Sequence, residues 1–146
     1  MERPTWDEYY MDMARKASTR SSVETTQVGA VLVSPNANTV VSTGYNGRVA
    51  GAVHKRVDEG DEEKECHAEM NAIAFAARAG IATLGSILYT THTPCVSCAK
   101  LIAQAGITRV VTLENKPLNK DLDKFYGDGL SVLLEGNVKI TYMVED

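Results

Sequence analysis

The sequence predicts one α/β domain in which helices cover both faces of a mixed five-stranded sheet. An amphipathic helix pattern opens the chain, two β-branched runs separated by turn residues follow, and a strand–helix–strand pattern occupies residues 87–113. The strand–helix–strand unit implies a parallel pair of strands joined by a crossover helix. The two β-branched runs read instead as a hairpin. We therefore expect a three-layer α/β/α architecture.

Helices and strands are expected along almost the whole chain, with no repeat, linker or second domain. Their expected bounds are a helix over 5–17, strands over 28–33 and 40–45, a polar loop over 46–65, a helix from 67 to just before 80, a strand over 87–91, a helix over 95–105, a strand over 109–113, a loop over 114–121, a helix around 130–134 and a strand over 138–143.

The elements of the first half follow from local signals. Thr5 and Glu8 have the spacing of a capping box, and apolar residues recur after them at helical intervals. Ser34-Pro35-Asn36-Ala37-Asn38 is turn chemistry, so it joins the first two strands as a hairpin. The loop that follows opens with Asn46-Gly47 and contains a run of charged residues over 58–65.

The elements of the second half are bounded mainly by glycines. Gly80 and Gly106 stand where a helix should end, since glycine is the preferred residue just beyond a helix C-terminus. The β-branched runs before and after the second of these helices read as strands. Beyond Leu113 the signals are weaker, and they predict one short helix and one last strand.

Composition excludes several classes of protein. The 146 residues carry a formal net charge of −4, whereas a general nucleic-acid binder normally has a basic surface. No apolar stretch is long enough to span a bilayer, and the start of the chain lacks the apolar core of a signal peptide. Three cysteines, two of them in Cys-x-x-Cys, argue against a disulfide framework. We expect a single domain over 1–146 in the cytoplasm, without membrane or nucleic-acid partners.

Two short motifs point to a metal site. His67-Ala68-Glu69 and Pro94-Cys95-Val96-Ser97-Cys98 together supply one imidazole and two thiolates. One nitrogen and two sulfur ligands suit Zn²⁺ and leave its fourth tetrahedral position open, which is the arrangement of catalytic rather than structural zinc. The two motifs together form the signature of zinc-dependent nucleobase deaminases. We predict one catalytic zinc per chain.

Glu69 is the expected catalytic residue. His67 and Cys95 fall where helices start, and Cys98 follows one turn later, so helix dipoles favour thiolates at this place. Zinc lowers the pKa of its water towards about 7, and Glu69 is close enough to His67 to exchange protons with that water. The alternative is a closed structural zinc knuckle with Cys66 as fourth ligand, although Cys66 is better explained as a buried small apolar side chain.

Beyond these motifs, the chain resembles the deoxycytidylate (dCMP) deaminases, particularly their phage-type members, over about residues 20–111. Phe75-Ala76-Ala77-Arg78 extends the similarity to the phage type. The other segments that carry the resemblance are Thr26-Gln27-Val28-Gly29-Ala30-Val31, Gly44-Tyr45-Asn46-Gly47, Cys66-His67-Ala68-Glu69-Met70-Asn71-Ala72-Ile73 and Pro94-Cys95-Val96-Ser97-Cys98-Ala99-Lys100-Leu101-Ile102.

The resemblance implies a fold like that of cytidine deaminases and the hydrolysis of dCMP to dUMP and ammonia, on the route to thymidylate. It also implies a homohexamer that is activated by dCTP and inhibited by dTTP, with Mg²⁺ accompanying the bound triphosphate. If the source is a phage, the enzyme is expected in the host cytoplasm. Arg78 could lie at a subunit interface, although a lone helix arginine is more often solvated.

The resemblance and the local chemistry together nominate residues for substrate and effector. Arg20 matches an arginine near the substrate phosphate in the family, and Asn46 is placed to bond a deoxyribose hydroxyl. The full set expected at the substrate is Arg20, Asn46, Ala68, Phe75, His92, Thr93 and Pro94. The set expected at the regulatory nucleotide is Gly44, Tyr45, Asn46, Gly47, His54, Lys55 and Arg56.

Each of these assignments has a plainer structural alternative. Gly44 and Gly47 permit positive φ and close backbone approach, which a phosphate-binding turn would use, but Asn-Gly is equally an ordinary hairpin turn. Arg20 could be a solvated cation at a helix end. Phe75 could belong to the core, and His92 could be a polar residue at a strand end.

Other activities share the motif. A tRNA adenosine deaminase would have the same zinc chemistry but would need a strongly basic surface. A free cytidine deaminase fits less well because Gly44-Tyr45-Asn46-Gly47 does not match its sugar-binding strand. A zinc protein that only binds a nucleotide would keep the cysteines and lose the carboxylate, whereas Glu69 is present.

Overall fold

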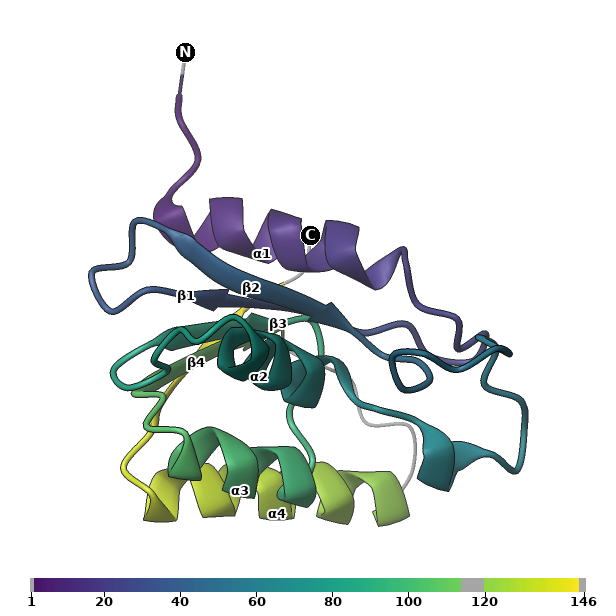
Figure 1. Ribbon diagram of the computed structural model, residues 1–146. Coiled ribbons are helices and arrows are strands. Elements are labelled where there is room, and N and C mark those ends of the chain that lie inside the picture. The colour runs from purple at the N-terminus through teal and green to yellow at the C-terminus, as the bar shows by residue number, and fades with distance from the viewer. Residues whose placement is uncertain (1, 114–119, 145–146) are drawn as a thin grey trace.

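The computed structural model describes residues 2–113 and 120–144, with the backbone alone described over 120–126 (Figure 1). The order of the five strands in the sheet is β2-β1-β3-β4-β5. β1 pairs antiparallel with β2 and β3, whereas β3, β4 and β5 run parallel. The predicted mixed five-stranded sheet is therefore confirmed. The strands are β1 (Gly29–Val33), β2 (Val40–Tyr45), β3 (Ile87–Thr90), β4 (Arg109–Leu113) and β5 (Lys139–Met143).

Helices lie on both faces of the sheet, as predicted (Figure 1). α1 (Trp6–Ser18) covers one face, and α2 (Ala68–Arg78), α3 (Val96–Gln104) and α4 (Lys120–Glu135) cover the other. Successive side chains along a strand point to opposite faces, so each strand supplies both cores. In β1, Val31 packs with α1 while Leu32 packs with the helices of the other face. The architecture is three-layer α/β/α.

The first helix and the hairpin have the predicted chemistry. The Thr5 side chain accepts a hydrogen bond from the Glu8 backbone N–H at 3.1 Å, and the Glu8 side chain accepts one from the Thr5 N–H at 3.0 Å. This is the reciprocal capping box expected from the sequence. β1 and β2 are joined by a turn in which Ala37 has a φ of 62°.

The starts of α2 and α3 are placed by the strands before them. α3 follows the carboxyl end of β3, and its N-cap residue is Cys95. α2 has His67 as its N-cap, and the preceding Cys66 pairs with Gly47 through backbone hydrogen bonds of 2.7 and 3.0 Å. That pairing brings the start of α2 beside the segment that leaves β2. Both helix starts therefore lie near one end of the sheet.

The last helix is longer than expected. α4 runs over Lys120–Glu135, whereas the sequence indicated a short helix around 130–134 after a loop over 114–121; residues 114–119 of that loop lie outside the described residues. Gly127 and Gly129 lower the helical propensity of this segment, so the sequence predicts a shorter helix than the structure has. Gly129 is instead a packing residue, since a Cβ there would lie 2.2 Å from the Pro94 carbonyl oxygen. No described helix combines the length and apolarity needed to cross a lipid bilayer.

Candidate metal and catalytic site

Three side chains that can bind a metal meet where α2 and α3 begin. Nδ1 of His67 lies 3.4 Å from Sγ of Cys95 and 3.5 Å from Sγ of Cys98. Both cysteines are buried, and His67 is half-buried. The helix starts explain this meeting, because Cys95 is an N-cap and Cys98 lies in the first turn beyond it. The structure thus brings together the three residues that the sequence nominated as ligands.

The donor set fits Zn²⁺. The three donor atoms lie within 4.8 Å of one another, and within the described part of the chain no other Cys, His or carboxylate joins this group. One imidazole nitrogen and two sulfurs with a fourth position open are the ligands of a catalytic zinc site. Cys66 is half-buried and stands outside the group. The four-ligand knuckle considered for Cys66 therefore has no support in this geometry.

The cluster favours a thiolate even without a metal. Hydrogen bonds from the Cys98 thiol and the His67 ring lower the pKa of Cys95 to about 4. The same contact with Cys95 raises the pKa of His67 to about 9. Donation to Cys95 also raises the pKa of Cys98. Since zinc takes thiolates and neutral imidazole, metal binding at this cluster releases protons.

Glu69 lies beside the metal cluster but is not part of its donor group. The residue belongs to the first turn of α2 and is only 4% exposed. Its Oε1 atom accepts a hydrogen bond from the Thr90 hydroxyl at 3.4 Å. Burial raises the pKa of Glu69. A buried carboxyl that binds a proton more readily than usual is suited to general acid–base chemistry.

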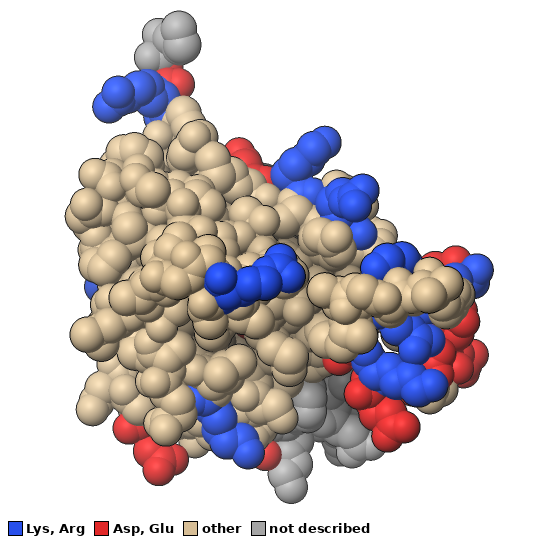
Figure 2. All heavy atoms as spheres, in the orientation of Figure 1, with Lys and Arg blue, Asp and Glu red and all other residues tan. Residues whose placement is uncertain are grey.

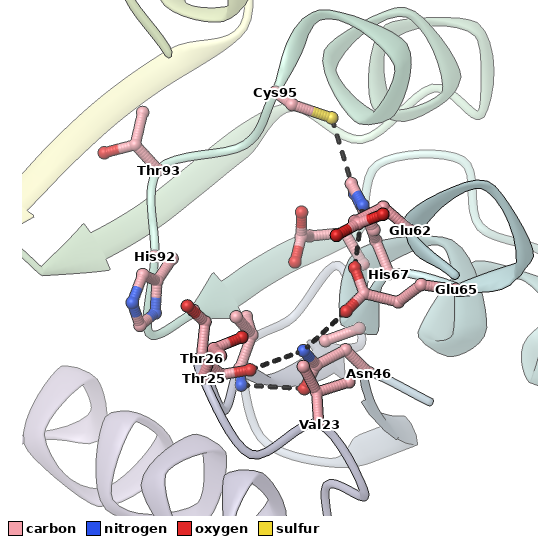
Figure 3. Close-up of a pocket in the computed structure, with 13 residues that line it drawn as sticks. Val23, Thr25, Thr26, Asn46, Glu62, Glu65, His67, His92, Thr93 and Cys95 are labelled. Carbon is pink, nitrogen blue, oxygen red and sulfur yellow. Dashed lines mark hydrogen bonds and ion pairs between the residues drawn. The ribbon is translucent and has the colours of Figure 1, made fainter. Parts of the chain in front are cut away.

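A cavity of about 220 Å³ adjoins the metal cluster (Figure 3). Its wall includes the nominated residues Asn46, Ala68, His92 and Thr93, together with members of the two zinc motifs. The remaining wall residues were not nominated from the sequence, because the segment before β1 and the 3-10 helix Glu62–Lys64 reach the cavity only through tertiary packing. Among the residues that the structure describes, the wall comprises Val23, Thr25, Thr26, Val28, Asn46, Glu62, Glu65, His67, Ala68, Glu69, His92, Thr93 and Cys95.

Three nominated substrate residues are not part of this wall. The Arg20 guanidinium lies over the Tyr45 ring, 5.8 Å from its centroid. Phe75 lies on the side of α2 that carries Arg78, whose guanidinium is 4.7 Å from the centroid of the Phe75 ring. Pro94 is buried, with its carbonyl facing Gly129 of α4. The expectation that Phe75 walls the pocket is not met, because α2 turns Ala68 and Glu69 toward the cavity instead.

Asn46 is held by the protein on three sides. Its Oδ1 atom accepts from the Val28 backbone N–H at 2.9 Å, and its Nδ2 donates to the Thr26 carbonyl at 2.8 Å and to Glu65 at 3.4 Å. Both amide protons are therefore used, but a carboxamide oxygen has two lone pairs and one remains. The side chain is 3% exposed and still lines the cavity, so its oxygen keeps one acceptor position that these bonds do not use.

Glu65 is a site residue that the sequence reading missed. Its Oε2 atom lies 3.3 Å from Nε2 of His67, the ring nitrogen that does not face the sulfurs. Glu65 and His67 stand two residues apart with extended backbone angles, so their side chains leave the chain on the same side. That spacing is the only signal in the sequence, and it does not stand out within a run of charged residues.

The nominated glycines do not form a phosphate-binding turn of the expected kind. Neither Gly44 nor Gly47 has a positive φ, so that expectation is wrong. Gly44 is still within β2, and a Cβ there would lie 2.3 Å from the Ala68 carbonyl oxygen and 2.7 Å from the Ala72 nitrogen. Gly44 therefore lets α2 pack closely on β2. Gly47 pairs with Cys66, which keeps its backbone extended.

Two of the three nominated basic residues of the following loop, His54 and Arg56, already have acidic partners. His54 lies 3.5 Å from Asp58, and Arg56 contacts both Asp58 at 2.8 Å and Glu24 at 3.0 Å. Lys55 is exposed. Figure 2 shows positive and negative side chains mixed at the end of the molecule where this loop lies in Figure 1. The visible face has no continuous basic stripe of the kind that RNA recognition would require.

Known proteins with similar sequences support the assignment of a zinc-binding deaminase site. The family model of the cytidine and deoxycytidylate deaminase zinc-binding region matches residues 4–114. The chain belongs to this deaminase family. ComE operon protein 2 of Bacillus subtilis is 40% identical over 121 residues, which cover 79% of this chain and 62% of that protein. Deoxycytidylate deaminase of Mycobacterium phage D29 is 39% identical over 127 residues, which cover 76% of this chain and 96% of the phage protein.

The same fold occurs in a solved deaminase structure. The crystal structure of dCMP deaminase from cyanophage S-TIM5, in complex with dCMP and dUMP, matches with a TM-score of 0.82 at 30% identity. The match covers 98% of this chain and 100% of that chain. The deaminase fold predicted from the sequence is thus confirmed, and the zinc-binding region of the family contains all three clustered ligands.

Proposed function

We propose that this member of the deaminase family hydrolyses dCMP to dUMP and ammonia. The observation that carries the proposal is the place of Glu69, which lines the cavity beside the metal cluster without joining its donors. The substrate is supported by the relatives, since the D29 protein is named deoxycytidylate deaminase and the cyanophage structure contains dCMP and dUMP. The proposed active unit is one domain over 1–146.

The chemistry adds one water to the amino-bearing ring carbon, where a C–O bond forms and a C–N bond breaks. When bound by His67, Cys95 and Cys98, Zn²⁺ supplies the Lewis acidity that makes water nucleophilic near neutral pH. Glu69 takes the proton from the attacking water and gives it to the adjacent ring nitrogen. Glu69 then takes the remaining proton of the added hydroxyl group and transfers it to the amino group, which leaves as ammonia, so that a carbonyl remains on the ring.

Most of the proposed substrate contacts come from residues of the cavity wall. We assign the free lone pair of Asn46 Oδ1 to the deoxyribose hydroxyl, and Ala68, His92 and Thr93 to the base. Arg20 is assigned to the phosphate, as the resemblance implies, and it would reach the phosphate from outside the cavity wall. Phe75 and Pro94 receive no substrate contact in this proposal.

One assay separates the candidate activities. Ammonia release should be measured with the zinc-loaded protein on dCMP, deoxycytidine, dCTP and tRNA at equal concentration. We expect dCMP to give the highest kcat/KM. A higher value on deoxycytidine or tRNA would assign the protein to another deaminase group. Zinc-loaded protein that releases ammonia from none of the four would indicate a nucleotide-binding protein without catalysis.

We further propose that dCTP with Mg²⁺ activates the enzyme and that dTTP inhibits it. The triphosphate would lie along the segment that contains Gly44, Tyr45, Asn46 and Gly47 and the cations His54, Lys55 and Arg56. Two contacts link this segment to the site, because Gly47 pairs with Cys66 beside the metal ligand and Asn46 lines the cavity. The ion pairs of the loop are exposed, so phosphates could replace their carboxylates at little cost.

The regulatory proposal has its own test. Allosteric coupling is typically about 1–3 kcal/mol, so initial rates at low dCMP should change roughly 5- to 150-fold with saturating effector. The rates are measured with dCTP and Mg²⁺, with dTTP and Mg²⁺, and with Mg²⁺ alone as control. Hyperbolic kinetics that ignore both triphosphates would contradict the proposal.

The remaining expectations concern the oligomeric state and the cellular compartment. We propose a homohexamer with Arg78 at a subunit contact, in the cytoplasm of the cell that needs dUMP for thymidylate. Arg78 stacks on Phe75 at the surface of α2, so a partner subunit could cover both. Sedimentation velocity of the protein and of Arg78→Glu tests this, because reversing a charge that is buried in a subunit contact should dissociate the assembly. Unchanged sedimentation would remove Arg78 from the interface.

A further inference from the structure

Glu65 contacts two functional residues at once. One carboxylate oxygen lies 3.3 Å from Nε2 of His67, and the other accepts a hydrogen bond from the Asn46 amide at 3.4 Å. The Glu65 side chain is 17% exposed and lines the cavity. Figure 3 shows Glu65 between His67 and Asn46, with both contacts drawn. A carboxylate in this position is well placed to influence the metal ligand.

The position of Glu65 is set from both neighbouring segments. Cys66, the next residue, is held by two backbone hydrogen bonds with Gly47. Asn46 is fixed in turn by bonds to the backbone of Val28 and Thr26. Glu65 therefore belongs to a rigid network that connects the segment before β1, the end of β2 and the start of α2.

The contact between Glu65 and His67 affects how the His67 ring can bind a metal. Nδ1 of His67 faces both sulfurs, so it is the nitrogen available to a metal shared with the cysteines. A ligand nitrogen must be unprotonated, so the ring proton must be on Nε2. A carboxylate beside Nε2 favours that tautomer, restricts rotation of the ring and increases the basicity of the ligand nitrogen.

We propose that Glu65 is a positioning residue for the metal ligand His67. Glu65 stabilises the tautomer and ring orientation that bind zinc, while Asn46 keeps the Glu65 carboxylate in place. This inference rests on the zinc site of the proposed function, but not on the identity of the substrate. The carboxylate lies on the Nε2 side of the ring and stands outside the donor group, so it acts through His67 rather than as a ligand.

The first measurement is zinc affinity, obtained by competition with a chromophoric chelator at fixed pH and without substrate. Loss of such a partner typically weakens metal binding about 10- to 100-fold, which we expect for Glu65→Ala. Glu65→Gln keeps an acceptor atom and should lose less. Glu62→Ala is the matched control, because Glu62 lines the same cavity and its Oε1 accepts from the Gly60 backbone N–H. It should bind zinc like the parent.

The second measurement separates positioning from general destabilisation. In the zinc-loaded parent, the Nε2 proton of His67 should give a slowly exchanging signal in ¹H–¹⁵N spectra of the histidine rings. The signal should broaden or vanish in Glu65→Ala and persist in Glu62→Ala. If Glu65→Ala does not fold, Glu65→Gln is compared with Glu62→Gln in the same two measurements. Equal zinc affinities and equal proton signals within either pair would overturn the proposal.

The outcome is independent of the substrate assignment. If the parent binds zinc but does not deaminate dCMP, the proposed function fails while the zinc affinities of the Glu65 variants still decide the role of Glu65. If the parent deaminates dCMP and Glu65→Ala binds zinc normally, the inference about Glu65 fails alone.

Discussion

Two regions of the molecule differ in how their polar groups are arranged. One is formed by the starts of α2 and α3, and the other is the segment over residues 44–56. At the helix starts, three donor atoms lie within 4.8 Å of one another and two of the three side chains are buried. Along the 44–56 segment, His54, Lys55 and Arg56 are exposed, and His54 and Arg56 contact acidic side chains. The first region is preorganised for a ligand, whereas the second must exchange partners to bind one.

This difference in preorganisation indicates which region suits catalysis and which region suits regulation. Preorganised groups in a water-poor site act strongly on a reacting molecule and need no rearrangement. Exposed ion pairs contribute little and can be exchanged at low cost, which suits a segment that responds to an effector. The two regions are nevertheless connected, because Asn46 and Gly47 contact Glu65 and Cys66 just before His67. The predictions that follow test each side of this comparison.

The largest effect should come from the metal ligands. Cys95→Ser and Cys98→Ser should lose both zinc and deaminase activity, since each removes one of three donors, while the parent should hold about one Zn²⁺ per chain. Elemental analysis after gel filtration and ammonia release are the measurements. Cys66→Ser is the matched control and should keep its metal. Two zincs in the parent, or metal loss in Cys66→Ser, would contradict the three-ligand assignment.

Glu69→Gln should keep zinc and lose most of the activity. The amide cannot carry protons, and a general acid–base group typically contributes about 10²–10⁴-fold to the rate. The measurement is kcat on dCMP together with the zinc content of the same sample. Glu63→Gln serves as control, because it is the same substitution at an exposed glutamate outside the cavity wall. Near-normal turnover of zinc-loaded Glu69→Gln would disprove the proton-transfer role.

Arg20→Ala tests whether a residue outside the cavity wall contacts the substrate phosphate. A charge-assisted hydrogen bond of about 1.5–3 kcal/mol implies a roughly ten- to hundredfold loss of kcat/KM on dCMP. Activity on deoxycytidine, which lacks the phosphate, should change much less. Arg15→Ala removes an arginine that pairs with Asp12 on α1 and is the control. Equal losses on both substrates would indicate a role for Arg20 in folding or regulation instead.

The smallest effect separates the two glycines of the 44–56 segment. Gly44→Ala should lower the free energy of unfolding by about 1–3 kcal/mol, because its Cβ would overlap the Ala68 and Ala72 backbone. Gly47→Ala should cost less, since its Cβ meets only the Ser22 hydroxyl, at 3.1 Å. Urea unfolding of the zinc-loaded proteins measures both. Equal stabilities would show that Gly44 is not a packing residue.

Sequence predictions were confirmed where the residues that carry the signal are neighbours in the chain. The capping box of Thr5 and Glu8, the hairpin turn at 34–38 and the helix starts at His67 and Cys95 rest on residues adjacent in the chain, and the structure has each of them. The last helix was underestimated because Gly129 is tolerated for its contact with Pro94, which lies far away in the sequence. Propensity alone cannot show such a contact.

The sequence by itself determined the layered fold and the set of metal donors. Spacing on a helix places Cys95 and Cys98 one turn apart, and period-two alternation assigns each strand residue to a face. Tertiary structure decided the rest. It made Gly44 a packing residue without positive φ, directed Asn46 toward Thr26, Val28 and Glu65, and placed Glu65 beside His67. The physical reason is that a loop has no internal repeat, so its side chains take their positions from the elements packed around them.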